Sequence, residues 1–227
     1  MKKVVLISGG SDGLGKTIAK ELSKDYQVVI LSPTENKLKK TAGEIRVDYV
    51  VADVSDYKNL EKAIKQITSK YERIDCLINC AGLWIQGELD DNNAEDIKRV
   101  LEVNNLGVVF LSKAVIPQMK KQKQGQIINI NSQAGLYAKT ERSVYNAAKW
   151  GVTGFTKSLQ EELAKYGISV TGIYPGKMNT KMFEKMGIVK DMGDALDPIE
   201  VARVVKFLLE TNKSVNFPEI GIKNLSY

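Results

Sequence analysis

The sequence of 227 residues contains no histidine, and this absence removes the side chain that most often moves protons or binds metals in proteins. A serine–histidine–carboxylate triad is excluded outright. Only two cysteines are present, Cys76 and Cys80, so a zinc site is not expected either. Any proton chemistry near neutral pH has to come from other side chains.

The cysteines and the apolar runs indicate the compartment. Cys76 and Cys80 lie in one predicted strand, where a rise of about 3.3 Å per residue separates their Cα atoms by about 13 Å, too far for a disulfide. No apolar run approaches the roughly 20 residues that span a bilayer. The apolar stretch after Lys3 is about six residues, which is too short for a signal peptide. We therefore expect a cytoplasmic protein with reduced cysteines and no membrane partner.

The chain is basic: 33 basic residues against 27 acidic ones give a net charge of +6. Lysine clusters at 36–40 and 120–124 contribute to it. We interpret them as solvated helix faces and loops rather than a nucleic-acid surface, because no aromatic-and-basic stripe or recognition-helix motif accompanies them.

Short β-branched runs alternate along the chain with segments of helical period. Strands are expected over 2–8, 26–32, 45–54, 74–82, 125–131, 168–176 and 214–222. Helices are expected over 14–25, 36–44, 57–71, about 93–120, 143–167 and 197–210. This alternation predicts an α/β fold: a doubly wound, Rossmann-type parallel sheet with helices on both faces, in one domain over 1–227. Ser55 or Asp56 is the expected cap of one helix, and Asp197 with Pro198 begins the last.

A glycine-rich loop joins the first strand to the first helix. Gly9, Gly13 and Gly15 have the spacing G-x-x-x-G-x-G. Such glycines allow a tight turn, close approach of a pyrophosphate and close packing of helix on sheet, while the helix N-terminus attracts phosphate. A glycine-rich turn without a ligand is the alternative, but the place of the loop favours dinucleotide binding. It is not a P-loop, because no GK[ST] ends it.

Tyr145 and Lys149 are four residues apart in "YNAAK" and share one face of a predicted helix. By themselves they favour two surface residues over a proton-transfer pair, because tyrosines and lysines are common on ordinary amphipathic helices. Other motifs accompany them in a fixed order. These are "SGGSDGLG" (8–15), "ADV" (52–54), "NCAG" (79–82), "VNNLG" (103–107), "INSQAG" (130–135) and "YPGKMNT" (174–180).

This series of motifs, spread over about residues 3–210, resembles the short-chain dehydrogenase/reductase family. Ser8 replaces the usual threonine of the glycine motif, and Cys80 replaces an asparagine. The resemblance implies an NAD(P)(H)-dependent oxidoreductase that interconverts a carbonyl and an alcohol. It implies a catalytic set of Ser132, Tyr145, Lys149 and Asn104, with Ser132 holding the carbonyl and Asn104 anchoring a water.

The same resemblance implies the residues that contact the cofactor. They are Gly9, Ser11, Asp12, Gly13, Leu14, Gly15, Ser32, Asp53, Val54, Asn79, Ala81, Gly82, Tyr145, Lys149, Pro175, Gly176 and Thr180. Several have plainer alternatives: Asp53 and Thr180 as helix caps, Ser132 as a turn or cap residue, Asn104 in an interrupted helix, and Pro175 with Gly176 as a turn.

Tyr145 is the expected general acid. A lysine ammonium about 4 Å from the phenol attracts its anion by about 4 kcal/mol at an effective dielectric constant of about 20. We therefore expect Lys149 to lower the phenol pKa by up to about three, less a contribution from desolvation.

The second strand ends at Ser32, where NAD-binding members of the family carry an acidic residue against the ribose hydroxyls. Ser32, Thr34 and Lys37 are suited to a 2′-phosphate, whereas Asp12 and Pro33 stand where NADP-binding members often have basic residues. We expect NADP, with NAD as the alternative.

The family builds its substrate lid in the segment that corresponds to 177–197. Its apolar side chains favour an apolar carbonyl substrate; they are Met178, Met182, Phe183, Met186 and Met192. The alternative is a lid that packs on its own domain. Other candidate walls are Trp84, Ile85, Leu136, Tyr137 and Tyr174. No arginine stands out to bind a carboxylate, which leaves Lys177 or Lys181.

Two other functions remain open. A sugar-nucleotide epimerase or dehydratase shares Y-x-x-x-K, but the stretch after Tyr174 is short for its substrate domain. A dinucleotide-binding regulator without turnover is the other. We also expect a homo-oligomer, either a dimer or a tetramer.

Overall fold

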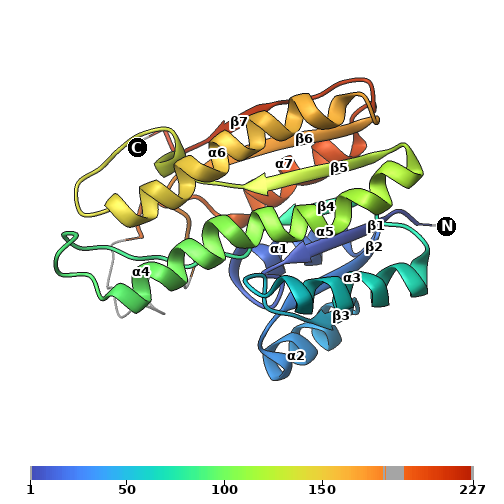
Figure 1. Ribbon diagram of the computed structural model, residues 1–227, viewed down its shortest axis with the longest axis horizontal. Coiled ribbons are helices and arrows are strands. Elements are labelled where there is room, and N and C mark those ends of the chain that lie inside the picture. Colours follow the sequence, from blue (N-terminus) through green and yellow to red (C-terminus); the bar gives the residue numbers. More distant parts are fainter. Residues whose placement is uncertain (1, 181, 183–191, 226–227) are drawn as a thin grey trace.

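A computed structural model describes residues 2–180, 182 and 192–225. Its centre is a seven-stranded, wholly parallel sheet with the strand order β3-β2-β1-β4-β5-β6-β7 (Figure 1). The strands are β1 Val4–Ser8, β2 Gln27–Ser32, β3 Asp48–Val51, β4 Cys76–Asn79, β5 Gly125–Ile130, β6 Ile168–Pro175 and β7 Glu219–Ile222. The predicted doubly wound sheet is confirmed.

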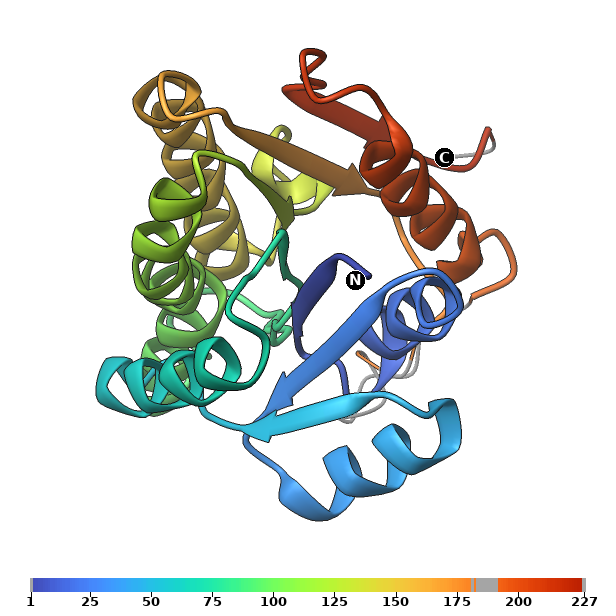
Figure 2. The ribbon, with the colours of Figure 1, turned by 90° about the vertical axis from the view of Figure 1, so that its right-hand side faces the viewer.

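Helices cover both faces of this sheet (Figure 2). One apolar core lies between the sheet and α3 Tyr57–Tyr71, α5 Gly107–Gln122 and α6 Ser143–Ala164. The other lies under α1 Gly13–Leu22, α2 Glu35–Ile45 and α7 Pro198–Glu210. Because both faces are buried, the central strands are mostly apolar, as in β1, where all five residues are buried and only Ser8 is polar.

Two of the predicted caps are observed. The Asp56 carboxylate accepts a hydrogen bond from the Asn59 N–H at 3.1 Å and begins α3. The Asp197 carboxylate accepts from the Ile199 N–H at 2.9 Å, with Pro198 in the first turn of α7. Each carboxylate satisfies an N–H that has no acceptor within its own helix.

Several predicted strands are shorter in the structure. Residues 52–54 leave the sheet after β3, and Cys80 and Ala81 leave it after β4. The backbone N–H groups of Cys80 and Ala81 donate instead to the Ser8 hydroxyl, at 3.0 and 3.2 Å. Both segments leave the sheet at its carboxyl edge, so the residues that follow β3 lie near those that follow β4.

The predicted helix at about 93–120 is continuous but not uniform. It consists of α4 Ala94–Leu101, a π-helical turn η1 Glu102–Leu106 and α5. By length and composition alone this helix resembles a membrane span, because an 18-residue window within Ala94–Gln122 has a mean hydropathy of 1.4. Among the described residues it is the one such helix. It packs on β4, β5, α3 and α6, which makes it a core helix.

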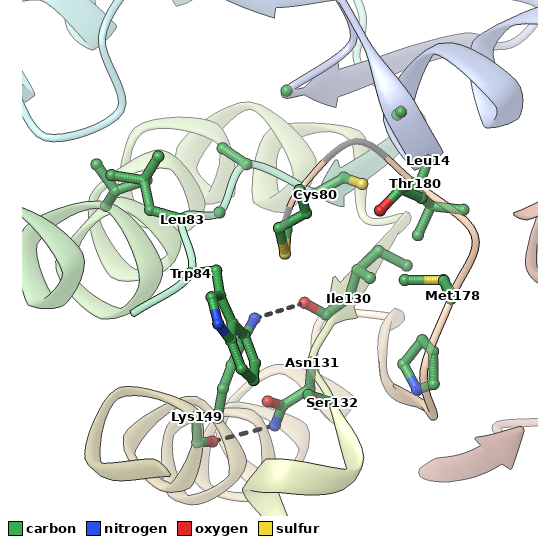
Figure 3. Close-up of a pocket in the computed structure, with 18 of the residues that line it drawn as sticks. Leu14, Cys80, Leu83, Trp84, Ile130, Asn131, Ser132, Lys149, Met178 and Thr180 are labelled. Carbon is green, nitrogen blue, oxygen red and sulfur yellow. Dashed lines mark hydrogen bonds between the residues drawn. The ribbon is translucent and has the colours of Figure 1, made fainter. Parts of the chain in front are cut away.

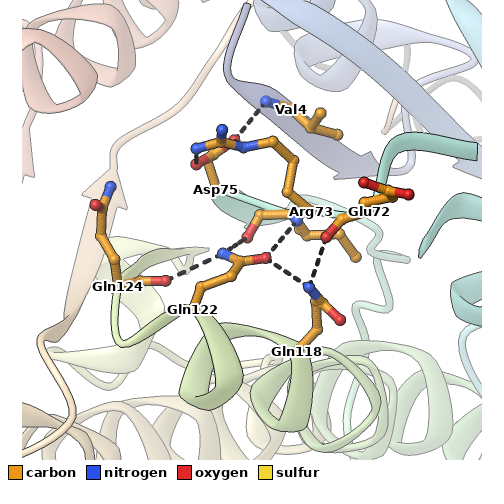
Figure 4. Close-up of polar contacts among 8 residues, drawn as sticks. Val4, Glu72, Arg73, Asp75, Gln118, Gln122 and Gln124 are labelled. Carbon is orange, nitrogen blue, oxygen red and sulfur yellow. Dashed lines mark hydrogen bonds and ion pairs between the residues drawn. The ribbon is translucent and has the colours of Figure 1, made fainter. Parts of the chain in front are cut away.

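The amino edge of the sheet is held by a polar cluster (Figure 4). The buried Asp75 carboxylate accepts from the Val4 N–H at 2.7 Å and pairs with Arg73 at 2.5 Å. Gln122 donates to the Ile74 carbonyl and accepts from the Ile74 N–H. This cluster ties β1 and β4 to α5 at the edge opposite the glycine loop, and the order of the sheet reverses between these same two strands.

Candidate active site

A cavity of about 800 Å³ opens at the carboxyl edge of the sheet, beside the reversal between β1 and β4. Ligands of doubly wound folds bind at such a reversal. Figure 3 shows its lining, with Leu14 and Thr180 toward one side and Trp84 and Lys149 toward the other. Most of the predicted site residues line it: Gly9, Ser11, Asp12, Gly13, Leu14, Gly15, Ser32, Asp53, Val54, Ala81, Gly82, Ser132, Tyr145, Lys149, Pro175, Gly176 and Thr180.

The predicted residues Asn79 and Asn104 do not line the cavity. Asn79 is buried in the core, where its amide donates to Ser112 and Asn129. Asn104 is fully buried in the π-helical turn. Its side chain accepts from the Leu83 N–H and donates to the Leu83 carbonyl, both at 2.7 Å. Asn104 therefore holds the cavity wall from behind, as the interrupted-helix alternative suggested.

The glycine loop has the geometry that a pyrophosphate site needs. Gly9 and Gly13 have φ of +69° and +50°, a region that favours glycine. A Cβ on Gly15 would lie 2.4 Å from the Gly9 carbonyl oxygen, so only glycine lets α1 approach the loop so closely. The first turn of α1 directs its N–H groups at the cavity, where they attract phosphate. The Asp12 carboxylate takes one of these donors, the Gly13 N–H, at 2.7 Å.

The end of β2 forms another part of the cavity. The Ser32 hydroxyl accepts a hydrogen bond from the Ser11 hydroxyl at 3.0 Å. Thr34 begins α2 but its side chain forms no capping bond, and Thr34 and Lys37 both line the cavity. This region therefore offers hydroxyl groups, a cation and a helix N-terminus, which together suit an anionic group such as a ribose phosphate.

Asp53 is paired in a way that the sequence did not indicate. Its carboxylate accepts from the Ser55 hydroxyl at 2.7 Å and forms an ion pair with Arg99 at 2.8 Å. Burial raises the pKa of Asp53, but the hydrogen bonds from Ser55 and Arg99 outweigh it and leave that pKa below its ordinary value. Asp53 is not the N-cap of α3, which is Asp56.

Ser132, Tyr145 and Lys149 come together at the other end of the cavity. Ser132 follows β5 and caps a short 3₁₀ turn, η2 Gln133–Gly135, by accepting from the Ala134 N–H. Tyr145 and Lys149 lie one turn apart on α6, each 5% exposed. The Lys149 ammonium donates to the Ile130 carbonyl at 3.2 Å (Figure 3).

The expected lowering of the Tyr145 pKa by Lys149 is wrong. Burial raises the pKa of Tyr145 to about 12, against smaller opposing effects of the Ser132 hydrogen bond and the Arg142 charge. The Lys149 ammonium lies 5.8 Å from the centre of the Tyr145 ring and is bonded elsewhere. Burial also lowers the pKa of Lys149 to about 8. Desolvation therefore dominates both groups and keeps the phenol protonated near neutral pH.

Cys80 also lines the cavity, yet its environment does not activate it. Burial raises the pKa of its thiol to about 12, so the nucleophilic thiolate is not populated near neutral pH. Cys76 and Cys80 are both free thiols, which confirms that they are unpaired.

Aromatic and apolar side chains form the wall beside Tyr145. The Trp84 ring lies 4.5 Å from the Tyr145 ring, and Tyr137, Met178 and Met182 also line the cavity. Ile85, Leu136 and Tyr174, which we also expected in the wall, do not; the Tyr174 hydroxyl is bonded to Glu219. Of the predicted lid, Phe183 and Met186 lie outside the described residues, as does Lys181.

Sequence reasoning missed two arginines that line the cavity, Arg99 and Arg142. Arg99 contacts Asp53 across 46 residues of sequence, and no local pattern indicates that contact. Arg142 precedes Tyr145 by three residues but is the N-cap of α6, outside the helix, so helical spacing did not predict its place. Lys177 lines the cavity as proposed and forms an ion pair with Asp194.

Comparison with known proteins identifies the family. A family model described as short chain dehydrogenase matches residues 3–189. Carbonyl reductase family member 4 of Xenopus tropicalis is 36% identical over 220 residues, which cover 93% of this chain and 92% of that protein.

Solved structures agree in fold over nearly the whole chain. The alcohol dehydrogenase of the archaeon Thermococcus sibiricus, complexed with 5-hydroxy-NADP, has a TM-score of 0.91 at 26% identity and covers 99% of this chain and 97% of its own. The closed form of serine dehydrogenase with NADP+ has a TM-score of 0.93 at 25% identity, covering 99% and 96%. This chain therefore belongs to the short-chain dehydrogenase/reductase family and is an NAD(P)-dependent oxidoreductase of the carbonyl reductase and alcohol dehydrogenase type.

Proposed function

We propose that this enzyme reduces the carbonyl group of a small substrate with an apolar body, with NADPH as the hydride donor. One observation carries the proposal. A single cavity has a pyrophosphate-type glycine loop at one end and Ser132, Tyr145 and Lys149 at the other. Bound there, the nicotinamide supplies the hydride, and the protein has to supply the proton and the orientation.

Tyr145 is the proposed proton donor. A phenol with a pKa of about 12 is neutral at physiological pH, and the neutral form is the one that donates. The oxygen of a carbonyl that accepts hydride becomes a strongly basic alkoxide, so the phenol needs no lowered pKa to protonate it. The same high pKa makes the reverse reaction, in which the phenolate must accept a proton, require a higher pH.

Ser132 and Lys149 would orient the reacting groups. We propose that the Ser132 hydroxyl donates to the substrate carbonyl and holds it against Tyr145. Lys149 would bond the nicotinamide ribose with the same ammonium that donates to the Ile130 carbonyl. We propose for Asn104 a supporting role, because its side chain fixes Leu83 in the wall beside them.

NADPH is proposed over NADH because of the charges near Ser32. A carboxylate at the end of β2 would repel a 2′-phosphate, and here that position is a serine. Thr34 and Lys37 line the same part of the cavity. Relatives in fold have been solved with NADP, which agrees with this choice.

An epimerase with a separate substrate domain is less well supported, since α7 begins soon after β6, at Pro198.

We further propose one cytoplasmic domain that self-associates. Exposed apolar side chains on α4, η1 and α6 support self-association: Leu101, Leu106 and Trp150. Size-exclusion chromatography with light scattering tests the self-association, and a strictly monomeric species would contradict it.

Tyr145→Phe tests the function. The variant keeps the ring that packs on Trp84 and loses only the hydroxyl. We expect turnover in NADPH oxidation across a panel of aldehydes and ketones to fall at least about a hundredfold, with NADPH affinity retained. Tyr166→Phe, at a position that does not line the cavity, is the matched control. Turnover of Tyr145→Phe within a few-fold of the parent would refute the mechanism.

A further inference from the structure

Arg142 places a cation at the reacting end of the cavity. Its guanidinium carbon lies 5.2 Å from the centre of the Trp84 ring, and that ring lies 4.5 Å from the Tyr145 ring. All three side chains line the cavity. The Arg142 charge also acts on the Tyr145 hydroxyl, whose pKa it lowers slightly against the larger effect of burial. A substrate whose carbonyl reaches Tyr145 therefore lies near this cation.

The backbone around Arg142 is well fixed. Its carbonyl accepts from the Asn146 N–H at 2.8 Å in the first turn of α6. The preceding carbonyl, of Glu141, accepts from the Gly87 N–H at 2.9 Å, and the Gln86 amide donates to the Glu141 carboxylate at 3.0 Å. These bonds join the segment that carries Trp84 to the segment that carries Arg142, so the arginine starts from a defined position.

The charges around Arg142 leave it available to a ligand. Within the part of the chain that the structure describes, no carboxylate forms an ion pair with Arg142, and none of its side-chain N–H groups forms a hydrogen bond. Among the described residues, the carboxylates that line the cavity are Asp12 and Asp53. Both belong to the half formed by the glycine loop and the end of β3, and Asp53 is paired with Arg99. A cation–π contact such as that with Trp84 uses the charge but not the N–H donors.

We propose that the substrate carries a carboxylate a few bonds from its carbonyl and that Arg142 binds this carboxylate. The inference rests on the proposed carbonyl reduction and adds the class of substrate, an oxo acid with an apolar body. A planar guanidinium matches a carboxylate with two parallel N–H···O bonds, and it remains charged at every working pH. Trp84 supplies the apolar surface between the carboxylate and the carbonyl.

Matched pairs of substrates test the proposal. The values of kcat/KM with NADPH are measured for a 2-oxo, a 3-oxo and a 4-oxo acid and for the methyl ester of each. Because acids and esters differ in intrinsic reactivity, the acid-to-ester ratio is compared between the parent and Arg142→Gln. We expect the ratio to fall at least about tenfold for one or more pairs, the range for a hydrogen bond to a charged group. Arg203→Gln, an exposed arginine on α7, is the control and leaves the ratio unchanged.

The outcomes separate the two proposals. A fall of less than about tenfold for all three pairs overturns the role of Arg142, while the carbonyl reduction stands. If neither acids nor esters consume NADPH, the proposed function fails and this inference with it. Thermal unfolding and NADPH affinity are measured for each variant. If Arg142→Gln does not fold, Arg142→Met replaces it: methionine keeps an apolar side chain against Trp84 without the charge or the N–H donors, and an unchanged acid-to-ester ratio in that variant overturns the proposal.

Discussion

Replacing Lys149 by methionine should change how the stability of the protein depends on pH. The Lys149 side chain is 5% exposed, and burial lowers its pKa from an ordinary value of 10.5 to about 8. Methionine keeps most of the volume and removes the charge. The variant therefore lacks the one amine at this position whose pKa is lower in the folded protein than in the unfolded chain.

The sign and the magnitude follow from proton linkage. Between about pH 8 and pH 10.5 the unfolded chain carries a proton on Lys149 that the folded protein has lost, so the free energy of unfolding rises with pH in this window. Below about pH 8 both states are protonated and the effect is constant. At about 1.36 kcal/mol for each unit of pKa, the rise between about pH 7 and about pH 9.5 is on the order of 2 kcal/mol.

Urea denaturation of the parent and of Lys149→Met at these two pH values measures the difference. Titration of every other group is shared by the two proteins and cancels in the comparison. From the lower to the higher pH, the free energy of unfolding should rise by about 2 kcal/mol more for the parent than for the variant. Lys121→Met, at an exposed position of α5, is the control and should follow the parent. Equal pH dependence of the parent and Lys149→Met would refute the claim that burial depresses this pKa.

Two further substitutions test other parts of the structure. Ser32→Asp should shift the ratio of NADPH to NADH affinity toward NADH at least about tenfold, because it places a carboxylate beside the proposed 2′-phosphate site. Fluorescence titration of both cofactors measures this ratio, and an unchanged ratio contradicts the assignment of NADPH. Asp75→Ala should lower the free energy of unfolding by about 2–3 kcal/mol in urea, because it leaves the Val4 N–H and Arg73 without their acceptor. Asp25→Ala, which breaks an exposed ion pair, should cost far less, and equal losses would contradict the importance of the buried cluster.

Much of the fold was readable from the sequence because its signals are local. The period of apolar residues distinguishes strands from helices, and the caps at Asp56 and Asp197 act within one turn. The glycine spacing places Gly9 and Gly13 where the backbone needs positive φ. The four-residue spacing of Tyr145 and Lys149 puts them on one helix face whatever the rest of the chain does.

Only the tertiary structure decided how these pieces meet and what their environment does to them. The pairing of Asp53 with Arg99 joins residues 46 apart, and it depends on how the end of β3 meets α4. The role proposed for Arg142 depends on its contact with Trp84, which lies on a different segment. The Tyr145 pKa was predicted with the wrong sign, because the sequence shows which charges are neighbours but not how much water the fold removes around them. Desolvation is a property of the packed chain, and here it outweighs the opposing effects of the Ser132 hydrogen bond and the Arg142 charge on the Tyr145 pKa.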